Sequence, residues 1–141
     1  MRVVYTRLWV FIGIVFSMSC GSDEQPYHPI PSVPVDIQLN LTNLTYQQLT
    51  GQGWQYFSGG VKGIIVLKDN GIYRAFDRAC TYQSAESCAQ IDIHSSTLYL
   101  LDEGCCESTF DRTGAPTSGP ASINLREYSV TLDGDWLYIY N

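Results

Sequence analysis

Two hairpin patterns bracket a cysteine-rich segment, and this arrangement constrains the fold more than any other feature of the chain. Residues 63–76 contain two largely apolar runs around an Asp-Asn-Gly turn at 69–71. Apolar and polar side chains alternate along residues 128–132, and an Asp-Gly turn at 133–134 leads to an apolar and aromatic run at 136–140. Such dipeptides supply the positive φ angles that tight hairpins need, so both segments predict antiparallel strand pairs.

The rest of the domain also has strand character. Apolar and polar residues alternate along residues 35–41, which is typical of a half-buried strand, and residues 54–57 form a short aromatic run. Residues 42–53 are expected to form a polar loop, and residues 96–101 a further strand. Residues 79–120 are rich in Cys, Gly, Ser and Thr without a regular period, so we expect loops carried by the surrounding sheets. No sustained helical period occurs, and the predicted fold class is therefore all-β.

The first residues have the pattern of a secretory signal. Arg2 and Arg7 form a positive region, and residues 8–15 are almost entirely apolar but too short to span a membrane. Ser19 directly before Cys20 resembles the lipobox of bacterial lipoproteins, which predicts cleavage after residue 19 and acylation of Cys20. The alternative is an ordinary cysteine within a cleaved or buried helix.

Residues 20–34 predict a tether between the lipidated cysteine and a domain at residues 35–141. Four prolines within residues 21–34 oppose helices and sheet ladders and favour extended chain. The acidic residues at 22–24 resemble a Bacteroidetes-type signal for display on the outer surface, although a solvated linker explains them equally well. His28 is expected to be solvated in this tether. The predicted location is the bacterial outer membrane or cell envelope.

Charge limits the possible partners. Without residues 1–19 the chain has six basic residues against fourteen acidic ones, a net charge of −8. This balance excludes nucleic acid, whose binding depends on phosphate neutralisation, and it makes anionic lipid headgroups poor ligands. We expect contact with the membrane through the lipid anchor alone, and a partner that is an envelope protein or a ligand not identifiable from sequence.

Residues 61–141 resemble a Rieske iron–sulfur domain. Residues 71–82 are similar to the strand and first cluster loop of that family, with Cys80 at the position of its first cysteine ligand. Residues 108–111 and 114–121 are similar to its second cluster loop and to the proline loop beyond it. The resemblance implies small antiparallel sheets with a cysteine-bearing loop subdomain.

The resemblance also implies that the family's ligand set is incomplete. A Rieske [2Fe–2S] cluster takes two cysteines on one iron and two histidines on the other. Here the first histidine position is Tyr82, the second cysteine position is Glu103 and the second histidine position is Cys106. One ligand of four is retained in kind. His94 lies outside both loops and is not expected to substitute.

The domain beyond the tether has four of the five cysteines, and an even number in an oxidising compartment favours a disulfide framework. The residues alone allow Cys80–Cys106 with Cys88–Cys105, or Cys80–Cys105 with Cys88–Cys106, because adjacent Cys105 and Cys106 would make a strained ring. The family pattern implies the first pairing: Cys80 and Cys106 take ligand positions, and Cys105 matches the second-loop cysteine of the disulfide in respiratory-type Rieske proteins.

These observations predict a non-enzymatic, envelope-anchored lipoprotein without cofactor or metal, acting as a binding or structural module. The alternative is an electron-transfer iron–sulfur protein with atypical cluster ligation by Cys80, Cys88, Cys105 and Cys106. A thiol–disulfide oxidoreductase is disfavoured because the chain has no Cys-x-x-Cys motif, and hydrolase motifs are absent. The acidic pair Asp102-Glu103 is interpreted as turn residues.

Overall fold

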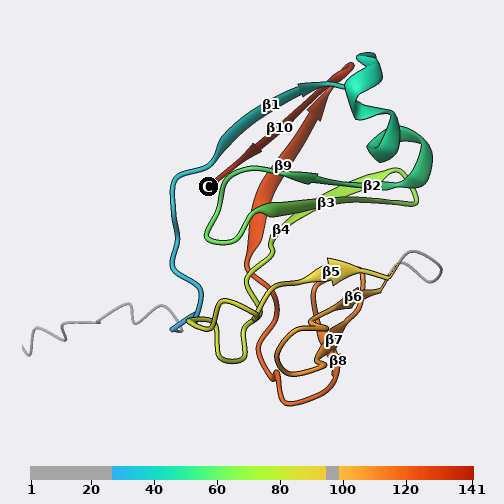
Figure 1. The fold of residues 1–141 in the computed structure, drawn as a ribbon. Helices are drawn as coiled ribbons and strands as arrows, with labels where there is room; N and C mark the ends of the chain where they lie inside the picture. Colours follow the sequence, from blue (N-terminus) through green and yellow to red (C-terminus); the bar gives the residue numbers. More distant parts are fainter. Residues whose placement is uncertain (1–26, 95–98) are drawn as a thin grey trace, which may run out of the picture.

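The computed structural model describes residues 27–94 and 99–141, which form two antiparallel sheets (Figure 1). The first sheet has the strand order β1-β10-β9-β4-β3-β2 and the second has the order β5-β6-β7-β8. The strands are β1 (Asp36–Asn40), β2 (Trp54–Phe57), β3 (Ile64–Asp69), β4 (Ile72–Asp77), β5 (Asp92–Ile93), β6 (Leu100–Leu101), β7 (Thr109–Phe110), β8 (Pro116–Ser118), β9 (Glu127–Asp133) and β10 (Trp136–Tyr140). The predicted all-β fold class is confirmed.

Both predicted hairpins are present in the larger sheet. Asp69 pairs with Ile72, so Asn70 and Gly71 alone make the β3–β4 turn, with φ angles of 49° and 84°. These positive angles explain why an Asn-Gly pair stands there. In the β9–β10 hairpin Asp133 still pairs with Trp136. The turn residues are therefore 134–135, one position later than the sequence pattern suggested.

Strand β3 is buried on both faces and joins the two halves of the core. Ile64 and Val66 pack into one hydrophobic cluster with residues of β1, β9 and β10. Ile65 and Leu67 point to the opposite face, into a second cluster that includes Cys80 and Phe110. Alternating side chains of one strand thus fill two cores. This explains why the sequence of β3 is continuously apolar rather than alternating.

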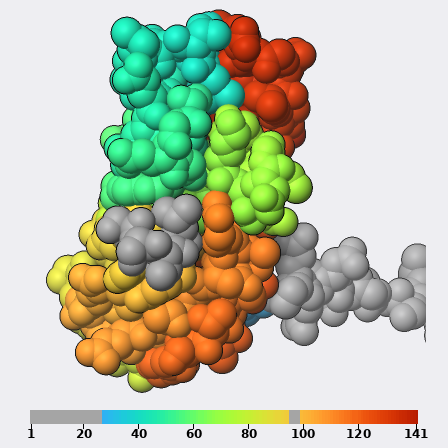
Figure 2. Space-filling view, turned by 90° about the vertical axis from the view of Figure 1, so that its right-hand side faces the viewer, coloured from blue at the N-terminus to red at the C-terminus, as the bar shows by residue number. Residues whose placement is uncertain are grey.

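The second core attaches the cysteine-bearing segment to the larger sheet. Figure 2 shows this segment, coloured yellow to orange, at one end of the molecule. Apart from a strand at 96–101, the sequence predicted only loops in this segment. The structure also contains the short strands β5 to β8, which form a small sheet that supports these loops. Of the strand expected at 96–101, only Leu100–Leu101 form a strand, β6, and residues 95–98 lie outside the described residues.

The segment expected to be a polar loop at 42–53 contains two short helices. A 3-10 helix, η1, spans Leu44–Tyr46, and the side chain of Asn43 accepts a hydrogen bond from the Thr45 N–H at its start. A π-helix, η2, spans Gln48–Gln52 and buries Leu49. Helices of three and five residues are too short to produce a helical period in the sequence, which is why the prediction missed them.

The described part of the predicted tether packs on the domain instead of extending freely from it. Ile30 is fully buried, and its carbonyl accepts a hydrogen bond from Nε of Arg126 at 2.6 Å. His28 is not simply solvated, because its Nε2 lies 3.0 Å from the carbonyl oxygen of Asn124. The predicted signal peptide at 1–19 and Cys20 lie outside the described residues. No helix among residues 27–94 and 99–141 is long and apolar enough to cross a membrane.

Candidate functional site

Cys80 lies in the loop that follows β4 and is completely buried. The loop is held by an isolated bridge between Ala79 and Gln90 and by a hydrogen bond of 3.0 Å from the Cys80 N–H to the carbonyl of Ala89. The Cys80 side chain belongs to the hydrophobic cluster between the larger sheet and the loop subdomain. The first loop therefore presents its cysteine inward.

Asp102 organises the second loop. It follows β6, is fully buried, and its N–H donates to the carbonyl of Ser108 at 3.0 Å. Its Oδ1 accepts hydrogen bonds from the N–H groups of Gly104 at 3.1 Å and Cys105 at 3.0 Å. The carboxylate thus closes a tight turn, as short acidic side chains often do. The turn interpretation of Asp102 is correct, but the side chain also points into the domain.

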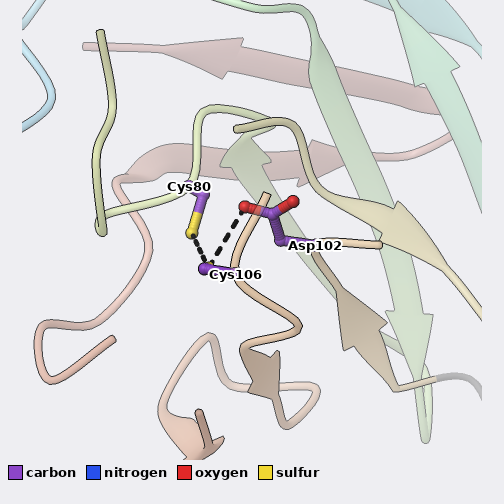
Figure 3. A group of neighbouring side chains, drawn as sticks. All are labelled: Cys80, Asp102 and Cys106. Atoms are coloured by element: carbon purple, nitrogen blue, oxygen red, sulfur yellow. Dashed lines mark hydrogen bonds between the residues drawn. The ribbon is translucent and has the colours of Figure 1, made fainter. Parts of the chain in front are cut away.

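The two loops bring Cys80, Asp102 and Cys106 together, and we call these residues the Cys–Asp–Cys group (Figure 3). The sulfur atoms of Cys80 and Cys106 are 3.6 Å apart. Cys106 Sγ lies 3.3 Å from Oδ2 of Asp102, and one potential ligand atom from each residue lies within 4.8 Å of the others. A third contact joins Cys106 Sγ to the Ser108 hydroxyl at 3.0 Å. The group can hold a proton, a disulfide or a metal ion.

The environment of Cys80 favours its neutral thiol. Burial raises the pKa of this thiol well above its ordinary value, because a thiolate loses hydration there. The backbone hydrogen bond from Tyr82 opposes that pKa shift, whereas the hydrogen bonds with Asp102 and Cys106 and the like charge of Cys106 add to it. Without a bound cation, Cys80 is therefore protonated at neutral pH.

One of the two expected disulfides is present. Cys88 and Cys105 are bonded, with their Cα atoms 5.3 Å apart, and this bond ties the first loop to the second. Gly104 fits against it closely, because a Cβ there would lie 2.7 Å from the carbonyl oxygen of Cys88. The bond also removes Cys88 and Cys105 from the four-cysteine ligand set considered as the alternative.

The expected Cys80–Cys106 disulfide is not formed, and both residues are free thiols. Their sulfur separation of 3.6 Å far exceeds the bond length of about 2.05 Å. The reason is the direction of the Cys106 side chain, whose sulfur contacts Asp102 and Ser108.

The two remaining Rieske ligand positions carry no inward donor. Tyr82 is 38% exposed and Glu103 is exposed. The sequence resemblance puts Glu103 at a ligand position, but the structure places its neighbour Asp102 in the group. Strand periodicity carried this signal: Leu100 is buried, and a side chain two residues later points to the same face.

Neither described histidine joins the group. The His94 ring stacks on Tyr99 with ring centroids 4.8 Å apart, as expected of a residue outside both loops. His28 contacts the segment near Asn124.

Comparison with known proteins gives matches among solved structures only. No protein-family model and no curated protein matches the chain. The cyanobacterial plasma membrane Rieske protein PetC3 from Synechocystis PCC 6803 matches at 19% identity and a TM-score of 0.55, over 77% of this chain and 98% of that one. The ferredoxin of carbazole 1,9a-dioxygenase from Nocardioides aromaticivorans IC177 matches at 25% identity and a TM-score of 0.49, over 77% and 97%.

The likeness to PetC3 concerns the fold alone. It covers 98% of that protein at a TM-score of 0.55, which shows that the two chains share a fold. The described part of this chain therefore has a Rieske-like fold.

Proposed function

We propose that this chain is a non-enzymatic Rieske-like protein that acts without a [2Fe–2S] cluster, as a binding or structural module. One observation carries the proposal: the Rieske ligand positions at residues 82 and 103 hold exposed side chains. A module of this kind keeps the sheet scaffold and the two crosslinked loops, and it offers their surface to a partner.

The donor set does not fit a Rieske cluster. Four protein ligands hold such a cluster, two of them histidines. Among the described residues the group offers two sulfurs and one carboxylate, Cys80, Cys106 and Asp102. Cys88 and Cys105 are consumed by their disulfide. The four-cysteine ligation therefore requires that bond to be reduced and both sulfurs to turn toward the group.

The second candidate is electron transfer through an iron–sulfur cluster of atypical ligation. Two observations favour it: the fold shared with a solved Rieske protein, and the gathering of three donors from the two loops that resemble the family's cluster loops. The similarity to a solved Rieske protein supports electron transfer more directly than a cluster-free module. The presence of three donors instead of four supports the cluster-free module.

Iron and sulfide analysis separates the two candidates. The full chain is purified without oxygen, and its iron, acid-labile sulfide and visible absorption are measured. The cluster-free proposal expects no acid-labile sulfide, no more than one iron per chain and no iron–sulfur absorption bands. Two irons and two sulfides per chain, with a paramagnetic signal on reduction that Cys80→Ser abolishes, would establish the second candidate.

We also propose that Cys20 is lipidated and anchors the protein in the bacterial envelope, where its partner is an envelope protein or a small ligand. The lipobox-like pattern and the net charge of −8 after cleavage support this, since few basic residues remain to bind lipid headgroups. In the test, wild-type protein sediments with membranes and Cys20→Ala is released into the soluble fraction. Membrane association of Cys20→Ala would contradict the proposed anchor.

A further inference from the structure

The Cys–Asp–Cys group has the composition and spacing of a site for a single metal ion. We propose that Cys80, Cys106 and Asp102 bind one divalent transition-metal ion of the zinc class, with two thiolates, one carboxylate oxygen and one open position. This site goes beyond both candidate functions, because neither the cluster-free module nor the iron–sulfur protein includes a site for a single metal ion.

The sulfur separation supports a metal ion over a disulfide. Two thiolates at about 2.3 Å from a tetrahedral ion lie roughly 3.8 Å apart. The sulfurs of Cys80 and Cys106 are 3.6 Å apart, close to that value and far from a covalent bond. The third ligand atom needs only a small side-chain movement, since all three atoms lie within 4.8 Å of one another.

Asp102 is oriented as a metal ligand. Its Oδ1 accepts from the N–H groups of Gly104 and Cys105, which fixes the carboxylate and leaves Oδ2 facing the Cys106 sulfur at 3.3 Å. Hydrogen bonds of this kind, which hold a ligand in place from behind, are a regular part of metal sites. Sequence spacing alone would not bring this oxygen to the sulfurs.

Charge supplies a second argument. Asp102 is completely buried, and in the described part of the chain no lysine or arginine pairs with it. A buried carboxylate without a cation is costly unless it is protonated or coordinates a metal. A divalent ion between the carboxylate and two sulfurs would provide the missing positive charge.

Ser108 completes the surroundings. Its Oγ accepts hydrogen bonds from the Ala121 N–H at 3.1 Å and from the Cys106 thiol at 3.0 Å. When a metal ion replaces the thiol proton, the Ser108 hydroxyl can donate its own proton to the sulfur. That donation stabilises a thiolate. Cys106 is the only partly exposed member of the group, so we place the open position on its side. Thiolate ligands favour zinc, cobalt or ferrous ions over calcium and magnesium.

Cobalt titration of the full chain, purified without oxygen, tests the site. We expect one Co²⁺ per chain, a thiolate-to-cobalt charge-transfer band, and displacement of Co²⁺ by Zn²⁺. Cys106→Ser should abolish the band. Asp102→Asn keeps an acceptor for the two N–H groups, so it should fold, and it should weaken Co²⁺ binding about tenfold or more. Glu103→Gln, at the exposed neighbouring carboxylate, should bind Co²⁺ as the wild type does.

Three results would overturn the proposal. The first is no charge-transfer band although alkylation and mass measurement show Cys80 and Cys106 to be free. The second is Co²⁺ binding that Asp102→Asn leaves unchanged. The third is an intact mass showing Cys80 and Cys106 joined in a disulfide in the protein purified without oxygen.

Discussion

Asp77 is a buried carboxylate that links three parts of the chain. It is fully buried at the end of β4 and accepts hydrogen bonds from the N–H groups of Val61 at 2.6 Å, Lys62 at 3.3 Å and Ala79 at 2.8 Å. The hydroxyl of Tyr128 donates to it at 2.8 Å. Since Ala79 precedes Cys80, this carboxylate also sets where the first cysteine loop begins.

Removal of the Asp77 carboxylate should be strongly destabilising. Asp77→Ala leaves four donors without their acceptor, and each buried unsatisfied group costs about 1–3 kcal/mol, so we expect a loss of about 3 kcal/mol or more. Urea unfolding followed by tryptophan fluorescence measures it. Asp36→Ala, at an exposed aspartate on β1, is the control and should change the free energy of unfolding little. Equal effects of the two substitutions would contradict the role of Asp77.

Tyr128 should make the protein sensitive to alkaline pH. Burial, followed by the hydrogen bond and charge of Asp77, raises the pKa of Tyr128 above its ordinary value of 10.0. Because the pKa of Tyr128 is higher in the folded state than in the unfolded state, its contribution to the free energy of unfolding is complete below pH 10 and declines as the pH rises further. Denaturant unfolding at several pH values should show that the free energy of unfolding of the wild type falls above pH 10, and that it falls less steeply in Tyr128→Phe. The same pH dependence in both proteins would contradict this role of Tyr128.

At the scale of elements, the proline loop lies directly against the second cysteine loop. Gly119 has a φ angle of 85°, and a Cβ at this position would lie 2.6 Å from the Cα of Ser108. Ser108 in turn contacts the Cys106 sulfur. A glycine is therefore needed here for two reasons, its backbone angle and the close approach of another chain segment.

The two requirements at Gly119 can be separated with a matched control. Gly71, in the β3–β4 turn, has nearly the same φ angle, 84°, but a Cβ at this position would have no other atom within 4 Å. Gly71→Ala should show only the cost of the backbone angle, about 1 kcal/mol. Gly119→Ala should cost clearly more, and thiol alkylation should show Cys106 more accessible. Equal losses in thermal unfolding would mean that the contact with Ser108 is unimportant.

The elements differ in how far they could be predicted. The strands β1, β3, β4, β9 and β10 follow from alternation, apolar runs and turn dipeptides, since these act over neighbouring residues. The two-residue strands β5 and β7 could not be recognised, because two residues carry no period. The short helices η1 and η2 escaped prediction for the same reason.

For the molecule as a whole, the Cys88–Cys105 bond should be the main crosslink. It closes a loop over a sequence separation of 17 residues, which stabilises by about 3 kcal/mol in the loop-entropy model. Replacing both cysteines with serine should lower the Tm by about 10 °C, measured with a chelator present. Reductant should lower the wild-type Tm similarly and leave the variant unchanged. An unchanged wild-type Tm under complete reduction would contradict this role.

The amino-acid sequence alone determines the longer strands and the hairpins, because periodicity and turn chemistry act between neighbouring residues. The incomplete ligand set follows from the resemblance to Rieske domains. Only the tertiary structure decides which side chains meet. Cys80 and Cys106 stand 26 positions apart and remain thiols, and Asp102 rather than Glu103 faces them. The neighbouring prolines led to the prediction that Ile30 lies in a free tether, but its side chain is buried in the domain. Such contacts depend on how two loops pack over a shared core, and no local pattern records that packing.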